Sequence, residues 1–333
     1  AASDVYKRQV LQVGTSSQKY QWEGFYTAAP STLSRKITVT GGYIKGGANY
    51  RANDNSNFFF NVGQIMRPPS FDGVFPNADY DFEEADEILN ESFTSFELGY
   101  GFRASNFKAT INAYHTVWGD RTLRRSTSID DQGVRIIYSG VEQTHQGIEG
   151  EMTWYPSNRL RIKGMFSLGD WKYTKNFQGD AYFIDNNQPA GTTGTLYLDG
   201  VKIGDAAQTV LYLGFDYKLS SKLSVDLDMM CYDNLHGRFG PLDSEFNSDN
   251  NRGSIKLPSW GTADLGATYS FSLLGYDARA RLNVNNLFDE EYLSQSQTNF
   301  HNDGGRTWNG VNVENNVYFG KGTTWNLGLN INF

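Results

Sequence analysis

The chain has 333 residues, a mean hydropathy of −0.53 and no run approaching the roughly 20 apolar residues of a spanning helix, which excludes a helical membrane protein. Its net charge of −8 argues against nucleic-acid binding, and its single cysteine, Cys231, excludes an internal disulfide. Aromatic residues make up 15% of the chain and glycine is abundant (35 residues) while proline is scarce (8), a balance typical of an all-β chain with many strands.

The first 40 residues show no sustained alternation, and we expect them to form an irregular N-terminal segment or an extracellular loop. Residues 3–9 (SDVYKRQ) look like a translated adapter sequence, and we expect them to contribute no element of the fold. The first ten residues also lack the apolar core of a signal peptide, which an outer-membrane protein requires. We therefore expect the natural chain to begin upstream of Ala1.

From residue 41 onward, apolar and polar residues alternate with the period of two that marks a β-strand with one apolar and one polar face. The last segment, WNLGLNINF, shows it most clearly, because every second residue from Trp325 is apolar. About eleven such segments occur, most of them close to the 9–11 residues that a tilted membrane-crossing strand needs. They are residues 41–51, 57–64, 93–103, 107–118, 144–155, 159–171, 207–219, 223–231, 260–272, 278–285 and 325–333.

The connections between these segments alternate in length. The short ones lie near residues 52–56, 104–106, 156–158, 220–221 and 273–276. The long ones lie near residues 67–91, 119–142, 172–205, 236–257 and 289–320. Short turns at one rim and long loops at the other are typical of an outer-membrane barrel, with periplasmic turns and extracellular loops. A soluble sandwich has no reason to sort its loops in this way.

The polar face of each strand faces either bulk water, as in a soluble sandwich, or a wet barrel lumen. Long strands with aromatic residues near their ends favour the membrane barrel, whose aromatic girdles lie at the two interfaces. In a barrel, the charged residues of the polar face point into the lumen, where they pair with one another or with a domain that plugs it. These predicted lumen-facing or plug-facing residues are Glu149, Glu151, Arg159, Arg161, Arg279 and Arg281.

Several segments resemble successive strand motifs of TonB-dependent outer-membrane receptors, in the style of those from Bacteroidota. They are GGANY at 46–50, RPPSF at 67–71, ELGYG at 97–101, GIEGE at 147–151 and NVNNLFDEEY at 283–292. The resemblance runs from about residue 40 to the C-terminus. It implies an all-β transmembrane antiparallel β-barrel, with residues 41–333 supplying the C-terminal half, roughly eleven strands, of a 22-stranded barrel. The plug domain and the TonB box of such receptors have no counterpart in this sequence.

The same resemblance implies the function and the partners. We expect energised import of a scarce bulky nutrient across the Gram-negative outer membrane, with a ferric siderophore as the first choice and cobalamin or an oligosaccharide open. The implied partners are the TonB complex, a plug domain, outer-membrane lipid, a small-molecule ligand and the barrel assembly machinery, with no nucleic acid and no cofactor. That machinery would read the terminal signal formed by Leu327, Leu329, Ile331 and Phe333.

The chain carries no recognisable enzyme constellation. Its four histidines are far apart, no GxSxG elbow or metal-binding motif occurs, and residues 243–251 (DSEFNSDNN) lack the spacing of a calcium loop. We therefore expect the protein not to be an enzyme. The alternatives to a gated receptor are a plug-free porin, an outer-membrane barrel enzyme or a soluble β-rich binding module.

Arginines and aromatic residues of the long connections are the candidate ligand contacts, because an arginine beside an aromatic ring can hold an anionic ferric chelate by charge and stacking. The alternative is that these arginines pair with the acidic residues of the loops. The candidates are Trp118, Arg121, Arg124, Arg125, Arg238, Phe239, Arg306 and Trp308.

Overall fold

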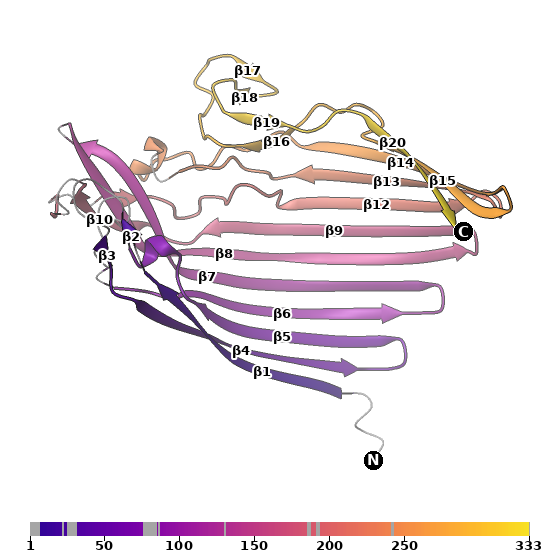
Figure 1. The fold of residues 1–333 in the computed structure, drawn as a ribbon, viewed down its shortest axis with the longest axis horizontal. Helices are drawn as coiled ribbons and strands as arrows, with labels where there is room; N and C mark the ends of the chain where they lie inside the picture. The colour runs from indigo at the N-terminus through magenta and orange to yellow at the C-terminus, as the bar shows by residue number, and fades with distance from the viewer. Residues whose placement is uncertain are drawn as a thin grey trace.

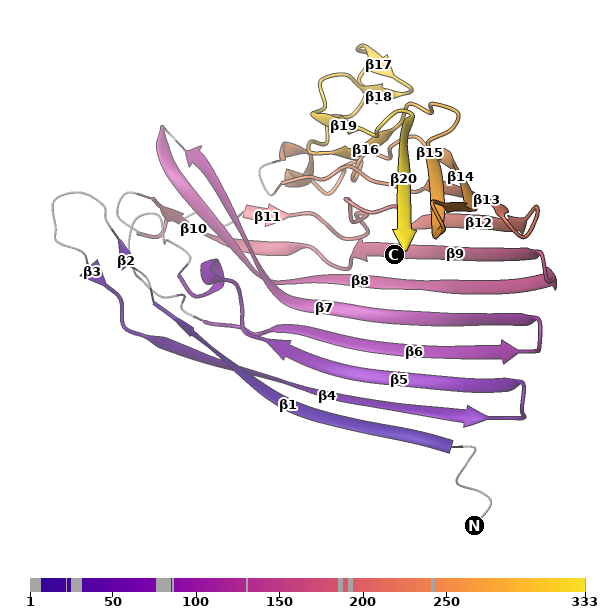
Figure 2. The same cartoon turned by 45° about the vertical axis from the view of Figure 1, so that its right-hand side comes forward.

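Most of the chain forms one long curved antiparallel sheet (Figure 1). A computed structural model describes residues 7–21, 23–24, 32–75, 85, 87–129, 131–184, 188–190, 194–240 and 243–332. Within these residues the main sheet has 14 strands, and its principal path runs β1-β4-β5-β6-β7-β8-β9-β12-β13-β14-β15-β20. Neighbours on this path are antiparallel, and β1 and β20 form the two edges of an open trough (Figure 2).

Each of the eleven segments that the alternation predicts overlaps a strand of the principal path, with differences of one or two residues at the ends of some, and Phe333 lies outside the described residues. The strands of this path are β1 (Lys7–Tyr20), β4 (Ile37–Arg51), β5 (Ser56–Arg67), β6 (Glu91–Arg103), β7 (Phe107–Ile129), β8 (Gln132–Ser157), β9 (Leu160–Tyr173), β12 (Thr209–Lys218), β13 (Leu223–Asp233), β14 (Trp260–Leu273), β15 (Tyr276–Asn285) and β20 (Thr324–Asn332). The all-β class and the antiparallel sheet are therefore confirmed.

Short elements form the long connections at one end of the sheet. They are β2 (Glu23–Gly24), β3 (Thr32–Leu33), the 3-10 turn η1 (Phe71–Gly73), β10 (Phe177–Phe183), β11 (Gly194–Leu196), η2 (Ser244–Asn247), β16 (Leu293–Ser296), β17 (Thr307–Trp308), β18 (Val311–Asn312) and β19 (Val317–Phe319). The opposite end carries only tight turns (Figure 1), so the predicted sorting of loops by length is present.

Two predicted loops are strands instead. Residues 7–20 belong to β1 rather than to an irregular segment, and they pair along their whole length with β4 from Lys7↔Tyr50 to Tyr20↔Ile37. The backbone ladder stabilises this strand although its side chains alternate weakly. The connection at 119–142 is also not an open loop, because β7 and β8 continue through it as a hairpin that rises past the end of the sheet (Figure 2).

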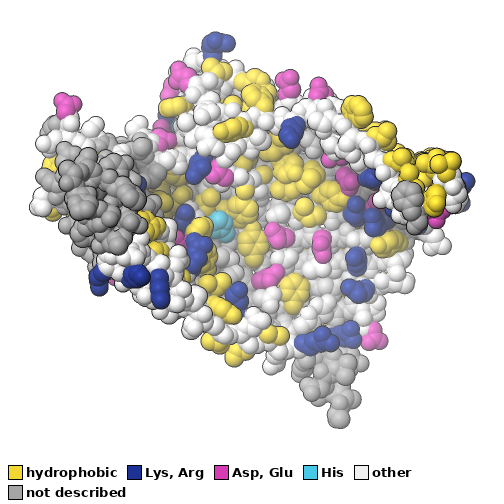
Figure 3. Space-filling model, viewed as in Figure 1, with side chains coloured by type: hydrophobic (Ala, Val, Ile, Leu, Met, Phe, Trp, Pro, Cys, Tyr) yellow, Lys and Arg dark blue, Asp and Glu magenta, His cyan; other side chains and the backbone are white. Residues whose placement is uncertain are grey.

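The register places the alternating apolar residues of most strands on the convex face. Leu98 of β6, for example, lies between Phe60 of β5 and Ala113 of β7, and it is 61% exposed. The opposite, concave face carries basic and acidic side chains among apolar ones, with Lys and Arg at both ends of the sheet (Figure 3). An exposed apolar belt backed by a charged concave face is the arrangement of a membrane barrel rather than of a soluble sandwich, whose apolar faces pack together.

The convex belt ends abruptly below the long loops. His115, Gln146 and Asp170 lie side by side on the convex face of β7, β8 and β9. His115 Nδ1 and Gln146 Oε1 are 3.1 Å apart, and Gln146 Nε2 donates to Asp170 Oδ2 at 3.1 Å. This polar row marks the upper limit of the apolar belt, so the loops above it lie outside the hydrocarbon layer. Among the described residues, no helix has the length and apolarity to cross a membrane.

The loop end has hydrophobic cores of its own. One cluster joins β8, β10, β11 and η2 through fully buried residues such as Tyr138, Leu196 and Phe246. A second joins the connections after β13 and β15 through residues that include Leu257, Leu293 and Val311. The long loops in the described part of the chain are therefore packed layers that hold side chains in defined positions over the mouth of the trough.

Candidate functional site

A cavity of about 450 Å³ lies among these packed loops, at the end of the trough opposite the tight turns. Four of the eight candidate ligand contacts line it: Trp118, Arg121, Arg238 and Phe239. Leu123 and Gly240, from the same two segments, also line it, and the remaining lining residues come from five further segments: Gln143, His145, Tyr173, Leu196, Ile203, Gly204, Asp205 and Gln297. The structure thus brings together residues more than one hundred positions apart in the sequence.

A β-bulge in β7 turns Trp118 and Arg121 to the same side. The register of β7 with β8 shifts between Trp118 and Arg121, and Asp120 adopts a positive φ of 58°. An odd spacing in a regular strand would place these two residues on opposite faces, whereas the extra residue of a bulge restores them to one face. The Arg121 guanidinium lies 3.9 Å from the centroid of the Trp118 ring, which is close cation–π geometry.

The ring of Trp118 is held from below by residues of β5 and β6. It stacks on Phe93 with a centroid separation of 5.0 Å and an interplanar angle of 24°. Its Nε1 donates a hydrogen bond to Glu91 Oε2 at 3.2 Å, and Glu91 is also ion-paired with Arg67. The platform for Arg121 is therefore ordered before any ligand enters the cavity.

The opposite wall of the cavity comes from the connection between β13 and β14. Arg238 Nε lies 3.7 Å from Asp205 Oδ2, and Asp205 also accepts a hydrogen bond from Gln295 Nε2 at 2.9 Å. Phe239 packs between Tyr173 (5.8 Å between centroids) and Phe246 (4.2 Å). Among the described residues, Arg121 has no carboxylate within ion-pair distance, so the charge of the lining residues is positive overall.

The other four candidates lie elsewhere. Arg124 is farther along β7, opposite Ile137, and the side chain of Arg125 is outside the described part of the chain. Arg306 is exposed beside β17, and the Trp308 ring packs edge-on against Phe319 at 5.2 Å and borders the second loop core. The geometry gives Trp308 a packing role and does not bring either residue to the cavity.

Ten of the cavity residues were not predicted as contacts, among them Gln143, His145 and Tyr173. Gln143 and His145 continue the odd-numbered, concave-facing series that includes Glu149 and Glu151. The odd-numbered positions of this part of β8 face the concave side, and extending this pattern upstream from Glu149 would have predicted Gln143 and His145 as cavity residues. This extension was missed because the alternation becomes recognisable only at residue 144, at the lower edge of the cavity.

The predicted lumen charges share the concave face, and several pair with one another. Arg161 Nε donates to Asp216 at 2.9 Å, Lys163 lies between Asp216 (3.5 Å) and Asp228 (3.4 Å), and Arg281 grips Asp226 with two bonds of 2.9 Å. Glu149 accepts from Ser167 Oγ at 3.1 Å. This lattice ties β8, β9, β12, β13 and β15 together, so mutual pairing accounts for much of the charge.

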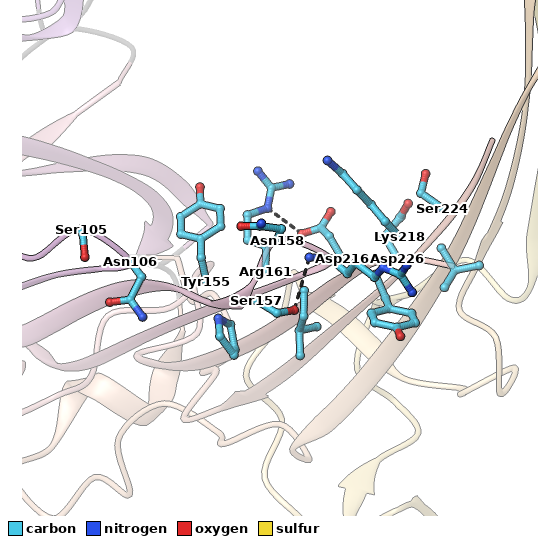
Figure 4. A pocket seen from close by; sticks show the side chains of 15 residues that line it. Ser105, Asn106, Tyr155, Ser157, Asn158, Arg161, Asp216, Lys218, Ser224 and Asp226 are labelled. Atoms are coloured by element: carbon cyan, nitrogen blue, oxygen red, sulfur yellow. Dashed lines mark hydrogen bonds and ion pairs between the residues drawn. The ribbon is translucent and has the colours of Figure 1, made fainter. Parts of the chain in front are cut away.

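Glu151 and Arg279 lie on the concave face without an ion pair among the described residues, and Arg159 lies in the tight turn before β9. Arg159 and Arg161 line a hollow of about 830 Å³ at the short-turn end, together with Asp216 and Asp226. Figure 4 shows Arg161 pointing to Asp216 within it, with Tyr155, Asn106 and Asn158 nearby. This hollow is the concave surface nearest the short-turn rim.

The acidic segment 243–251 is occupied by internal contacts. Asp243 accepts from the backbone N–H of Glu245 at 3.0 Å, which starts η2. The Glu245 carboxylate accepts hydrogen bonds from Arg252 Nε at 3.1 Å and from Arg252 Nη2 at 2.8 Å. Arg252 Nη1 donates a third hydrogen bond, of 2.5 Å, to Asp303 of the next long loop. Arg252 thus clamps two loops together.

In the described residues, no group of three or more His, Cys, Asp or Glu is arranged to hold a metal ion.

The clamp predicts a pH dependence for the order of these loops. The Arg252 guanidinium lowers the pKa of Glu245 from 4.5 to about 2. Because this pKa is depressed in the folded state, its stabilising contribution is complete above about pH 4.5 and is lost as the pH falls toward 2. We expect Glu245→Gln to increase amide hydrogen exchange across residues 243–254 at pH 7 and to flatten its pH dependence.

The matched control is Asp249→Asn, an exposed acid in the same loop with no ion pair among the described residues. This variant is expected to exchange like the wild type at pH 7. Equal exchange in the Glu245 variant and the wild type would show that the clamp does not order the loop.

Comparisons with known proteins agree with this geometry. Residues 17–287 match the family model described as TonB dependent receptor-like, beta-barrel. No curated protein sequence matches the chain. Similar solved structures include the ferric preacinetobactin receptor BauA from Acinetobacter baumannii (17% identity, TM-score 0.61, 98% of this chain and 40% of that one) and the ferric-catecholate import receptor Fiu from E. coli K12 (14%, 0.60, 98% and 42%).

A third is the ferric yersiniabactin uptake receptor FyuA from Yersinia pestis (13% identity, TM-score 0.61, 99% of this chain and 44% of that one). At these identities the likeness shows the fold alone. The chain spans less than half the length of each of these three structures.

Proposed function

The chain belongs to the TonB dependent receptor-like β-barrel family, which places it in the outer membrane, and from that premise we propose that it serves the TonB-dependent import of an anionic ferric siderophore. The observation that carries the proposal is the Trp118–Arg121 pair at the wall of a loop-end cavity. A guanidinium held over an indole offers both charge and a flat surface, which suits the anionic, planar iron-binding groups of a chelate.

The rest of the proposal concerns partners that lie outside the described residues. The paired charges of the concave wall and the hollow near Arg159 and Arg161 would face a plug domain, and the TonB complex would act through that plug. The barrel assembly machinery would read β20, on which Leu327, Leu329 and Ile331 share the convex face; Phe333 lies outside the described residues. That the receptor is of the Bacteroidota type stays a prediction.

Iron uptake tests this function. Cells that carry the gene are compared with cells from which it is deleted, using radioactive iron supplied as an anionic ferric tris-catecholate or as a neutral ferric trihydroxamate. We expect gene-dependent uptake of the anionic chelate, little uptake of the neutral one, and loss of uptake when tonB is deleted or a protonophore is added.

Other outcomes would select the alternatives. Gene-dependent entry that survives loss of TonB would indicate a plug-free porin, since passive diffusion needs no energy. A chelate that is consumed outside the cell without iron entry would indicate a barrel enzyme. Uptake of cobalamin or an oligosaccharide in place of both iron chelates would change the cargo and leave gated import standing.

A further inference from the structure

Glu91 is a buried carboxylate at the start of β6, beside the cavity but not among the residues that line it. Only 8% of its surface is exposed. Its Oε2 atom accepts the hydrogen bond from Trp118 Nε1 at 3.2 Å and is ion-paired with Arg67, which ends the neighbouring strand. A buried carboxylate is costly unless it is paired and hydrogen-bonded, and Glu91 meets both conditions through these two partners.

The two contacts on Trp118 have different consequences for its ring. Stacking on Phe93 fixes the plane of the indole but not which of its two edges faces β6, because a half-turn about the Cβ–Cγ bond keeps the plane and exchanges the edges. The bond from Nε1 to Glu91 removes that freedom, because the indole has a single N–H donor and only one orientation presents it to the carboxylate. The place at which Arg121 lies, 3.9 Å from the ring centroid, is therefore set by Glu91 through Trp118.

Arg67 keeps Glu91 in the orientation that this requires. Arg67 and Glu91 face each other across β5 and β6, and the guanidinium also lies 5.5 Å from the Phe93 ring and 5.9 Å from the Trp118 ring. An uncharged side chain in place of the Glu91 carboxylate would form no ion pair with Arg67. Its hydrogen bond from the Trp118 indole would also be weaker, because charge-assisted hydrogen bonds are the stronger ones.

We infer that Glu91 is a positioning residue for ligand binding: it orients the Trp118 indole, and thereby Arg121, without touching the ligand. The inference rests on the proposed function, since it assigns Glu91 to the same cavity. This role differs from general packing because Glu91 acts through a single hydrogen bond, the one that the Nε1–H of Trp118 donates.

A double-mutant cycle separates these roles. The protein is extracted from outer membranes in detergent, and its affinity for the anionic ferric tris-catecholate probe is measured for the wild type, Glu91→Gln, Trp118→Phe and the double variant. Phenylalanine keeps the stacking on Phe93 but has no N–H. We expect Glu91→Gln to weaken binding about 3- to 10-fold in the wild-type background, which is the range for one hydrogen bond, and to have no further effect in the Trp118→Phe background.

Glu97→Gln is the matched control. Glu97 lies on the same strand and the same concave face, and it accepts a bond from Asn61 Nδ2 at 2.8 Å without contacting Trp118. Its affinity is expected to equal that of the wild type. Equal losses for Glu91→Gln in both backgrounds would assign Glu91 a structural role and overturn the inference, as would wild-type affinity in Glu91→Gln.

A second measurement needs no Glu91 variant, in case that variant fails to assemble. The measurement is the rate at which the Nε1 proton of Trp118 exchanges with solvent, followed by proton NMR. The signal of this proton is identified by its absence from the spectrum of Trp118→Phe, and we expect it to exchange slowly. Rapid exchange would show that the bond to Glu91 does not persist and would contradict the inference. If the wild type binds no ferric probe at all, the proposed function fails while the exchange result still reports on Glu91.

Discussion

Leu98→Arg is expected to prevent stable assembly of the protein in the outer membrane. Leu98 projects from the middle of β6 on the convex face, is 61% exposed, and has only apolar neighbours across the ladder, Phe60 and Ala113. An arginine on the lipid face near the bilayer midplane costs about 2–4 kcal/mol. Because folded proteins are only marginally stable, a loss of that size is a large fraction of the total. The measurement is the amount of heat-modifiable folded protein in isolated outer membranes.

Asn112→Arg is the matched control, one rung away on β7. Asn112 pairs with Gly99 of β6 and with Glu149 of β8, and it lies on the concave face. A charge there meets the wet lumen and a nearby carboxylate, so this variant is expected to assemble close to the wild-type level. Equal assembly of both variants would show that the convex belt does not contact lipid, and equal failure would show that the site tolerates no long side chain on either face.

Alternation of residue type predicted most strands because membrane strands must separate an apolar from a polar face along their whole length. The same rule fails for β1, where Val10 and Leu11 are adjacent and residues 15–19 (TSSQK) are polar on both faces. That strand exists because β4 supplies a backbone partner at every position, which is a property of the neighbour and not of the segment. Sequence reasoning about one segment at a time cannot detect it.

The bulge at Asp120 limited the prediction in another way. It shifts the side-chain parity of β7, so the alternation that ends near Trp118 does not continue in phase and the rest of the strand was taken for a loop. Trp118 and Arg121 were nevertheless proposed as candidates, because an arginine and an aromatic ring close together suit an anionic ligand whatever the backbone does. That these two residues lie near Arg238 and Phe239 could not be predicted, because it depends on the order of the strands in the sheet and residue types do not encode that order.

For the charged residues of the concave wall, the face on which each lies follows from its own strand, whereas its partner depends on the neighbouring strands. Their shared face follows from odd spacing within each strand, which is the pattern that grouped Arg161 with Arg281 in the sequence. Their partners, Asp216 and Asp226, depend on the register between strands. Glu91 was missed because it is the first residue of β6, just before the alternation becomes visible, and because its significance lies in a contact to another strand pair.

Arg121→Met is expected to weaken binding of the anionic ferric tris-catecholate by about 10- to 100-fold, since a hydrogen bond to a charged group contributes about 1.5–3 kcal/mol. Methionine retains much of the length and apolar stem of arginine, so the cavity keeps its shape while it loses the guanidinium. Of the charges that line the cavity, Arg238 is offset by Asp205 at 3.7 Å, which leaves Arg121 as the larger contribution. Affinity measured in detergent, with the neutral ferric trihydroxamate alongside, checks the expectation.

Two further variants decide which property of Arg121 matters. Arg121→Lys keeps the charge but loses the planar group that lies 3.9 Å from the Trp118 ring, so it should recover only part of the affinity. Arg124→Met, on the same strand but away from the cavity, should bind as the wild type does. Full recovery in the lysine variant would reduce the site to a point charge, and Trp118 would then have no direct part in recognition. Equal weakening for the neutral and anionic chelates would mean that Arg121 shapes the cavity rather than attracting its ligand.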